Sequence, residues 1–222
     1  MFTPRRLDAT GAFDDTVSKK IVNGPMSEQV LTLAESLKDR ARAALGQRNL
    51  VLVGLMGAGK SSIGRLVAQQ LGIPFVDTDA EIERVSRMTI TELFAAYGEQ
   101  EFRALETRVI KRLLKGGPRV VSTGGGAFIN ESTRFHVKRG SLSVWLKADL
   151  DVLWERINKR DTRPLLKTEN PKQTLEDLMN ARYPIYAEAD LTVLSLDVGK
   201  ETMVKEVLAA IAEGKKAESK TP

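Results

Sequence analysis

The residues with the clearest capacity for chemistry lie in a glycine-rich segment in the first third of the chain. Residues 54–61 read Gly-Leu-Met-Gly-Ala-Gly-Lys-Ser, which matches the phosphate-binding loop pattern of nucleotide-binding proteins. The glycines let backbone amides turn inward toward phosphate oxygens. We expect Lys60 to contact the β and γ phosphates and the Ser61 hydroxyl to bind Mg²⁺. The alternative is a glycine-rich turn with a chance lysine, which is disfavoured because a strand-like and a helical pattern flank the motif.

Two carboxylates follow the next strand-like segment. In Val76-Asp77-Thr78-Asp79 they stand two residues apart at the carboxyl end of a strand, where ligands bind in parallel sheets. We expect Asp77 to hold Mg²⁺ through water and Asp79 to reach an acceptor hydroxyl. An alternative role for Asp79 is to cap a helix over residues 79–86, and the two roles are compatible.

Further candidate groups occur later in the chain. They are Arg103 and Glu106 one helical turn apart, three consecutive glycines at 124–126, Arg163 in an irregular segment, and Arg182 on a late helix. Taken singly, each arginine is more often a solvated surface charge, and Arg103 with Glu106 is also a routine helix-surface pair. Consecutive glycines let backbone amides approach a ligand closely. The order of these groups, rather than any one of them, indicates a small-molecule site.

Composition restricts the class of protein. The 222 residues contain no cysteine, which excludes disulfides and thiolate metal sites and fits a reducing compartment. The net charge of +5 admits a nucleic-acid partner, but aromatic residues make up only 5% of the chain and offer few stacking platforms. No apolar run approaches the roughly 20 residues of a membrane span, and residues 1–25 lack the apolar core of a secretory signal. We therefore expect a cytoplasmic protein with neither nucleic-acid nor membrane partners.

Hydrophobic patterning predicts the elements that position the candidate groups. Short apolar runs typical of buried strands occur at 49–54, 74–76, 119–122, 142–146 and 191–194. Helical periodicity occurs at 27–45, 61–71, 79–86, 91–97, 99–114, 150–158, 174–188 and 200–213. Strands that alternate with helices pair in parallel through right-handed crossovers, so we expect a three-layer α/β sandwich.

The same patterns suggest how the chain is organised. The expected order is a disordered extension at 1–25, a single domain at 26–213 with its core at 49–211, and a polar tail at 214–222. Met26 is an alternative start. Residues 160–171 combine prolines with charges and break the periodicity, which predicts a mobile loop. The single histidine, His136, lies on an expected surface helix away from the motifs and receives no role.

Taken in order, the motifs resemble those of the shikimate kinase family. The resemblance covers residues 49–211 and rests on the phosphate-binding loop, Asp77-Thr-Asp79, Phe102-Arg103, the glycine triplet, Arg163-Pro-Leu-Leu and Arg182-x-x-x-Tyr186. It implies a fold of the nucleoside-monophosphate-kinase type, with five parallel strands flanked by helices. It also implies a lid at about residues 157–171 and a substrate-binding region after the second strand. The extension before Asn49 departs from the compact family pattern.

The resemblance also implies the site residues. Shikimate would be bound by Asp79, Arg103, Gly125, Gly126 and Arg182, with Glu106 orienting Arg103. ATP would be bound by Gly57, Ala58, Gly59, Lys60, Ser61, Ser62, Arg156 and Arg163, and Mg²⁺ by Ser61 and Asp77. Arg163 would lie on the lid and Arg156 along the adenine, although Arg160 is near enough to compete. The expected catalytic residues are Lys60, Asp79 and Arg163.

The expected reaction transfers the γ-phosphoryl group of ATP, with Mg²⁺, to the 3-hydroxyl of shikimate, giving shikimate 3-phosphate and ADP in aromatic amino acid biosynthesis. The expected partners are shikimate and ATP, and the expected state is a monomer. Three alternatives stay open: another small-molecule kinase of this fold, such as a gluconate or nucleotide kinase; a nucleotide-dependent switch or nucleic-acid-associated ATPase; and an inactive binding module. Arg103 and Arg182 favour a small carboxylate over a nucleobase.

Overall fold

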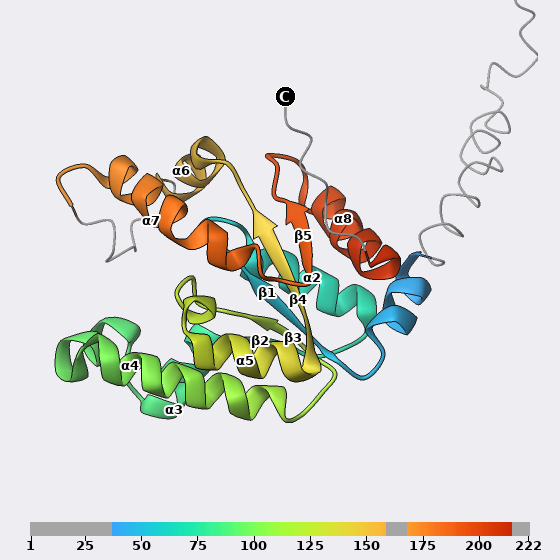
Figure 1. Cartoon of the computed structure of the whole chain (residues 1–222). Helices are drawn as coiled ribbons and strands as arrows, with labels where there is room; N and C mark the ends of the chain where they lie inside the picture. The colour runs from blue at the N-terminus through green and yellow to red at the C-terminus, as the bar shows by residue number, and fades with distance from the viewer. Residues whose placement is uncertain (1–36, 159–167, 215–222) are drawn as a thin grey trace, which may run out of the picture. The chain divides into compact units, whose positions relative to one another are not determined.

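The chain is built around one parallel β-sheet (Figure 1). The computed structural model describes residues 37–158 and 168–214. Its strands are β1 (Asn49–Val53), β2 (Phe75–Asp77), β3 (Val120–Ser122), β4 (Ser141–Lys147) and β5 (Leu191–Leu194). All neighbouring strands are parallel, in the order β2-β3-β1-β4-β5. The predicted five-stranded parallel sheet is confirmed.

The central strand, β1, explains why the sheet forms and where its ligand-binding edge lies. Its sequence Asn-Leu-Val-Leu-Val is buried along its whole length, as expected for a strand covered by helices on both faces. It pairs with β3 through Leu52 and Ser122, and β2 pairs with β3 through Asp77 and Ser122. Strands β1, β2 and β3 therefore end level with one another, and the segments that follow them meet at one edge.

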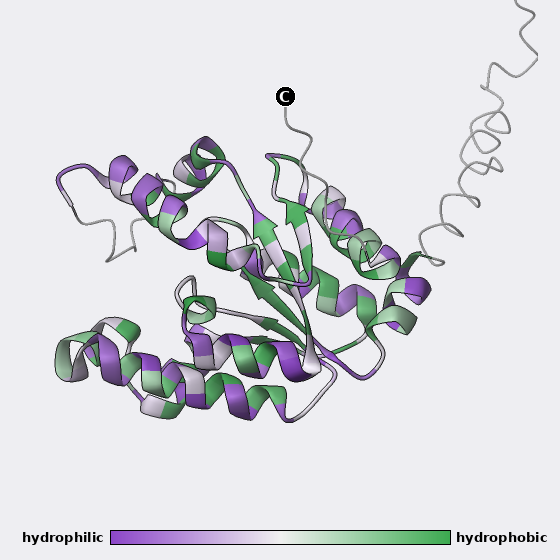
Figure 2. Cartoon of the chain, in the orientation of Figure 1, coloured by the Kyte–Doolittle hydropathy of each residue, from purple (hydrophilic) through white to green (hydrophobic). Residues whose placement is uncertain are grey.

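Helices cover both faces of the sheet. They are α2 (Lys60–Leu71), α3 (Thr78–Ser86), α4 (Ile90–Leu114), α5 (Glu131–Gly140), α6 (Leu150–Asn158), α7 (Pro171–Tyr186) and α8 (Lys200–Glu213), with a short 3₁₀ helix η1 (Ala127–Ile129). In Figure 1, α2 and α8 lie on one side of the sheet, and α5 and α7 on the other. Figure 2 shows mainly apolar strands between helices of mixed hydropathy, the pattern of a three-layer sandwich. Among the described helices, none has both the length and the apolarity to cross a membrane.

Only part of the predicted N-terminal helix falls within the described residues. Residues 37–45 are helical, and Ala41 and Leu45 are fully buried in the main core. The remainder of the predicted helix, the extension at 1–25, most of the predicted lid and nearly all of the polar tail lie outside the described residues. The domain boundaries given above therefore stay predictions.

A second, smaller core lies between α3 and α4. Its buried members are Ile82, Leu93, Phe102, Val109 and Leu113. Helix α4 bends at Gly98, where φ is 76° and ψ is 175°, a conformation that is essentially limited to glycine. The predicted interruption between residues 91–97 and 99–114 is thus a kink within α4. The part of α4 after the kink carries Arg103 and Glu106, so this small core positions both side chains.

Candidate active site

The phosphate-binding loop joins β1 to α2. Gly57 and Gly59 have φ values of 83° and 90°, which glycine adopts without strain. Lys60 is buried, and its Nζ donates to the carbonyl oxygens of Gly54 at 2.7 Å and Leu55 at 2.8 Å. No described side chain caps the N-terminus of α2, which leaves its first backbone amides to a bound anion. The loop therefore has the geometry of a phosphate cradle.

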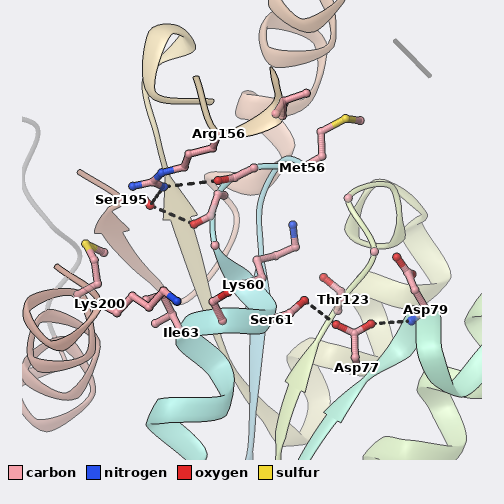
Figure 3. A pocket seen from close by; sticks show the side chains of 18 of the residues that line it. Met56, Lys60, Ser61, Ile63, Asp77, Asp79, Thr123, Arg156, Ser195 and Lys200 are labelled. Carbon is pink, nitrogen blue, oxygen red and sulfur yellow. Dashed lines mark hydrogen bonds between the residues drawn. The ribbon is translucent and has the colours of Figure 1, made fainter. Parts of the chain in front are cut away.

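Ser61 and Asp77 meet beside the loop (Figure 3). The Ser61 hydroxyl donates to Asp77 Oδ2 at 2.6 Å and lies 3.1 Å from the Ser122 Oγ. The other oxygen of Asp77, Oδ1, accepts from the backbone amide of Asp79 at 3.1 Å. Asp77 is therefore the N-cap of α3. The alternative role of Asp79 as the cap is wrong, because the helix begins one residue before it.

Asp79 reaches the first glycine of the triplet that follows β3. A methyl group on Gly124 would lie 2.6 Å from Asp79 Oδ1 and 3.0 Å from Glu106 Oε1, so a larger residue here would have to displace these carboxylates. The Gly124 amide is held by the buried Thr78 hydroxyl, to which it donates at 3.0 Å. Asp79 lines the same pocket as Lys60 and Ser61 (Figure 3). Asp79, the carboxylate predicted to reach the acceptor hydroxyl, thus faces the phosphate-binding loop.

Arg103 extends from α4 to the last glycine of the triplet. Its Nη1 donates to Glu106 Oε2 at 2.8 Å, while its Nε and Nη2 donate to Glu99 Oε1 at 3.3 and 3.2 Å. A methyl group built on Gly126 would lie 2.6 Å from both terminal nitrogens of Arg103. The guanidinium therefore rests directly against Gly126, held from behind by two carboxylates.

We expect Gly126→Ala to weaken ligand binding at this corner without unfolding the protein. The new methyl group meets the flexible end of Arg103 rather than backbone, so the guanidinium has to move. Loss of a hydrogen bond to a charged group lowers affinity by about 10-fold or more. Calorimetric titration with shikimate, the acceptor that the sequence resemblance implies, measures the change. Gly140→Ala is the matched control, because its methyl group would meet nothing within 4 Å. Equal affinities for shikimate in the two variants would contradict the assigned place of Arg103.

Glu106 is a buried carboxylate behind Arg103. Its side chain is 1% exposed, and its Oε1 has no hydrogen-bond partner among the described residues. Burial raises the pKa of Glu106 above its ordinary value, the Arg103 cation opposes this shift, and the Asp79 charge adds to it. Glu106 therefore contacts Arg103 directly and interacts electrostatically with Asp79.

The raised pKa of Glu106 predicts a pH-dependent difference in stability between wild type and Glu106→Gln. A carboxyl group with a raised pKa holds its proton more tightly in the folded chain, so its contribution to the free energy of unfolding is lost as the pH rises through the folded pKa. As the pH rises above 4.5, the ordinary pKa of a glutamate, wild type should therefore lose stability relative to the variant, which has no titrating group at this position. Urea unfolding at several pH values measures this. Parallel pH profiles would rule out the raised pKa.

Helix α7 brings Arg182 and Tyr186 to the middle glycine of the triplet. Arg182 Nη1 donates to the Gly125 carbonyl oxygen at 3.3 Å, and the Tyr186 hydroxyl donates to the same oxygen. A methyl group built on Gly125 would lie 3.5 Å from the Met56 amide nitrogen and 3.8 Å from Arg182 Nη1. The triplet is therefore enclosed between the phosphate-binding loop and α7. Arg103 and Arg182 approach neighbouring glycines from two different helices.

A pocket of about 450 Å³ extends from the phosphate-binding loop to the connection between β5 and α8 (Figure 3). At that end Arg156 of α6 donates to Ser195 Oγ at 2.9 Å, to the Leu196 carbonyl at 2.6 Å and to the Gly57 carbonyl at 3.4 Å. Ser195 in turn donates to the Ala58 carbonyl at 3.0 Å. These bonds tie α6 and the β5–α8 connection to the phosphate-binding loop.

Most of the predicted site residues line this pocket. They are Gly57, Ala58, Gly59, Lys60, Ser61, Ser62, Asp77, Asp79, Gly125 and Arg156. Arg103, Gly126 and Arg182 are not among the lining residues, but they adjoin it through their contacts at the glycine triplet. Arg163 and its neighbour Arg160 lie outside the described residues.

Comparison with known proteins identifies the family. A family model described as shikimate kinase matches residues 56–212, more than half of the chain. The chain belongs to the shikimate kinase family. The predicted family, the P-loop kinase fold and the predicted enzyme class are thereby confirmed.

Other shikimate kinases are similar over most of their length. The chain is 81% identical over 191 residues to the shikimate kinase of Rhizobium leguminosarum bv. trifolii (strain WSM2304), which is 86% of this chain and 97% of that protein. It is 71% identical over 192 residues to that of Rhizobium meliloti (strain 1021), which is 86% of this chain and all of that protein. A solved shikimate kinase from Acinetobacter baumannii in complex with shikimate matches with a TM-score of 0.74 and 36% identity, covering 79% of this chain and 98% of that one.

Sequence reasoning missed the residues at the far end of the pocket. Ser195, Asp197 and Lys200 line it, and all three come after β5. A usable signal was present, since ligands bind outside the carboxyl ends of parallel strands and these polar residues follow the last strand. The contact of Ser195 with Ala58 joins residues 137 positions apart, and no local pattern indicates it.

Proposed function

We propose that the chain phosphorylates shikimate, passing the γ-phosphoryl group of ATP to the 3-hydroxyl and giving shikimate 3-phosphate and ADP for aromatic amino acid biosynthesis. One observation carries this proposal. The glycine triplet at 124–126 has the phosphate-binding loop on one side and Asp79 with two arginines on the other. The glycine triplet is therefore a wall shared by two sites. One site takes the phosphoryl donor, and the other takes an acceptor with a hydroxyl and a carboxylate. Membership of the family, and a relative solved in complex with shikimate, support this acceptor.

On the donor side, the residues align the triphosphate and neutralise its charge. Phosphoryl transfer needs positioning and charge stabilisation more than a strong base. The amides of residues 57–62 and the Lys60 ammonium would hold the phosphates, and Arg156 would lie along the adenine. Arg163, which lies outside the described residues, is proposed as the cation that the lid brings to the transferring group. A closed lid would exclude water, which otherwise competes as an acceptor.

Ser61 and Asp77 fit a site for Mg²⁺. Their side-chain oxygens approach to 2.6 Å at the edge of the phosphate-binding loop. Hydroxyl and carboxylate oxygens suit this ion, which commonly keeps several waters and binds through one or two protein groups together with substrate phosphates. Ser61 would bind it directly and Asp77 through water. The bound ion supplies charge neutralisation on the β and γ phosphates.

On the acceptor side, Arg103 and Arg182 would bind the shikimate carboxylate. A planar guanidinium matches a carboxylate in shape and charge, and both side chains are already held beside the glycine triplet. Asp79 would hold the ring hydroxyls, orient the attacking oxygen and accept its proton. The amides of Gly125 and Gly126 complete the proposed contacts.

The proposal includes the setting of the reaction. We propose that the enzyme acts as a monomer. Its substrates are small molecules, and neither nucleic acid nor a membrane takes part. We propose that the reaction takes place in the cytoplasm. A protein without cysteine forms no disulfides and therefore does not depend on an oxidising compartment.

The carboxylate assignment is tested by comparing shikimate with its methyl ester in calorimetric titrations of the wild-type protein. The ester should bind at least about 10-fold more weakly, because it loses hydrogen bonds between a charged group and the two arginines. Gluconate, the acceptor of the rival sugar-acid kinase, should give no binding heat. Equal affinity for acid and ester would contradict the roles of Arg103 and Arg182, and binding of gluconate alone would favour the rival.

A further inference from the structure

One buried phenol contacts the acceptor site from behind. Tyr186 is fully buried, and its hydroxyl donates to the Gly125 carbonyl oxygen, which also accepts from Arg182 Nη1. Arg182 and Tyr186 are four residues apart on α7, so their side chains lie on the same face of the helix. A single carbonyl of the glycine triplet is thus fixed from two positions on one helix.

The peptide geometry gives this bond a consequence for the amides of the triplet. In a trans peptide the carbonyl of one residue and the amide N–H of the next point in opposite directions. Holding the Gly125 carbonyl toward α7 therefore turns the Gly126 amide away from α7. Three consecutive glycines have unusually large backbone freedom, so their orientation needs such an external constraint.

The charges around the phenol favour the same arrangement. Burial raises the pKa of Tyr186 to about 12, while a hydrogen bond and the charge of Arg182 oppose the shift. The charge of Arg103 also lowers the pKa of Tyr186, and the charge of Glu106 raises it. The phenol therefore interacts electrostatically with both arginines and with Glu106. The hydroxyl therefore stays protonated and remains a donor over the whole physiological pH range.

We propose that Tyr186 is a positioning residue for the acceptor, whose hydroxyl holds the Gly125 carbonyl and the Arg182 guanidinium in the one arrangement that receives shikimate. This inference rests on the proposed function. Tyr186 does not touch the substrate itself. It acts through two groups that do, and its loss affects acceptor binding rather than nucleotide binding.

The chain offers a closely matched control in Tyr183. This residue lies on the same helix, and its hydroxyl also donates to a backbone carbonyl, that of Ala148. Burial raises its pKa to about 12 as well. Its ring packs edge-on against Trp145 at 4.9 Å, and the Tyr186 ring lies 6.0 Å from the same tryptophan. Tyr186 is fully buried, whereas Tyr183 is partly buried. The two hydroxyls hold different carbonyls, and Ala148 is not among the residues assigned to the acceptor.

The experiment compares Tyr186→Phe with Tyr183→Phe in the full chain. Both variants lose one partly buried hydrogen bond, so both should melt lower by about 2–4 °C. Only Tyr186→Phe should raise the shikimate dissociation constant, by about 5- to 10-fold, as expected for a lost hydrogen bond that orders the site. Its KM for ATP should stay within about twofold of wild type, because the hydroxyl does not contact the phosphate-binding loop.

Other outcomes would overturn the inference. Unchanged shikimate affinity in Tyr186→Phe, or an equal loss in both variants, assigns the hydroxyl to stability alone. A parallel rise in the KM for ATP indicates general loosening of the site. If the wild-type protein itself fails to bind shikimate, the proposed function fails and this inference with it, so the two failures are distinguishable.

A double-mutant cycle with Arg182→Ala separates positioning from a more general effect. If the hydroxyl acts through Arg182, Tyr186→Phe should weaken shikimate binding less in the Arg182→Ala background than in wild type, because interacting groups are not additive. Loss by the same factor in both backgrounds overturns the claim that Tyr186 positions Arg182.

Discussion

Replacing Lys60 by alanine is expected to lower kcat by about 10³-fold, to the limit of detection. The Lys60 ammonium lies inside the phosphate-binding loop and is the cation that we place on the β and γ phosphates. Charge on the transferring group is stabilised chiefly by such fixed cations, so the loss of one of them slows the transfer. The substitution also removes the bonds to the Gly54 and Leu55 carbonyls, which shape the loop. Coupled measurement of ADP release gives the rate.

Two controls make the Lys60→Ala result specific. Shikimate binding to the variant without nucleotide should match wild type, because Lys60 is assigned to the donor side alone. Lys205→Ala, at an exposed position of α8, should retain full activity. A Lys60→Ala protein that is folded and turns over at the wild-type rate would refute the role of the loop.

Asp79→Asn is expected to lower kcat by about 10²- to 10⁴-fold, the range associated with a lost general acid or base. Asparagine nearly matches the shape of aspartate, so its side chain should occupy the same position beside Gly124. It cannot accept the proton of the attacking hydroxyl, and it removes a negative charge beside Glu106. The KM for ATP should change little, since we assign Asp79 to the acceptor side.

The Asp79→Asn prediction is checked by steady-state kinetics with both substrates varied. Asp151→Asn, which removes an exposed carboxylate paired with Lys172, is the surface control and should leave both constants unchanged. A large rise in the shikimate KM with an unchanged kcat would restrict Asp79 to binding. An unchanged kcat together with an unchanged KM would remove it from the site altogether.

Much of the fold was predictable because its signals are local. The apolar run at β1, the glycine loop and the helical pattern of α2 are contiguous, so one short window predicts strand, loop and helix together. The kink at Gly98 was also readable, since glycine interrupts a helical pattern. The alternative of Asp79 as the cap of α3 was wrong, because two aspartates two residues apart fit a helix start equally well until the backbone is known.

The site was predictable only in part, for a physical reason. The positions of Lys60 and Ser61 follow from the motif, but the approach of Arg103 to Gly126 depends on the packing of α4 against the sheet. The shared hold of Arg182 and Tyr186 on Gly125 is likewise a contact between elements far apart in the chain. Resemblance to a family named most of these residues. It did not indicate which groups fix one another.

The most direct test of the central claim is ADP production by the purified chain with ATP and Mg²⁺, measured with shikimate, gluconate, a nucleoside monophosphate or no acceptor. We predict rapid ADP release with shikimate and only background release in the other three reactions. Turnover with a different acceptor would leave the phosphate-binding loop intact but contradict the assignment of Arg103 and Arg182 to shikimate. Absence of turnover with every acceptor would contradict the proposed reaction itself.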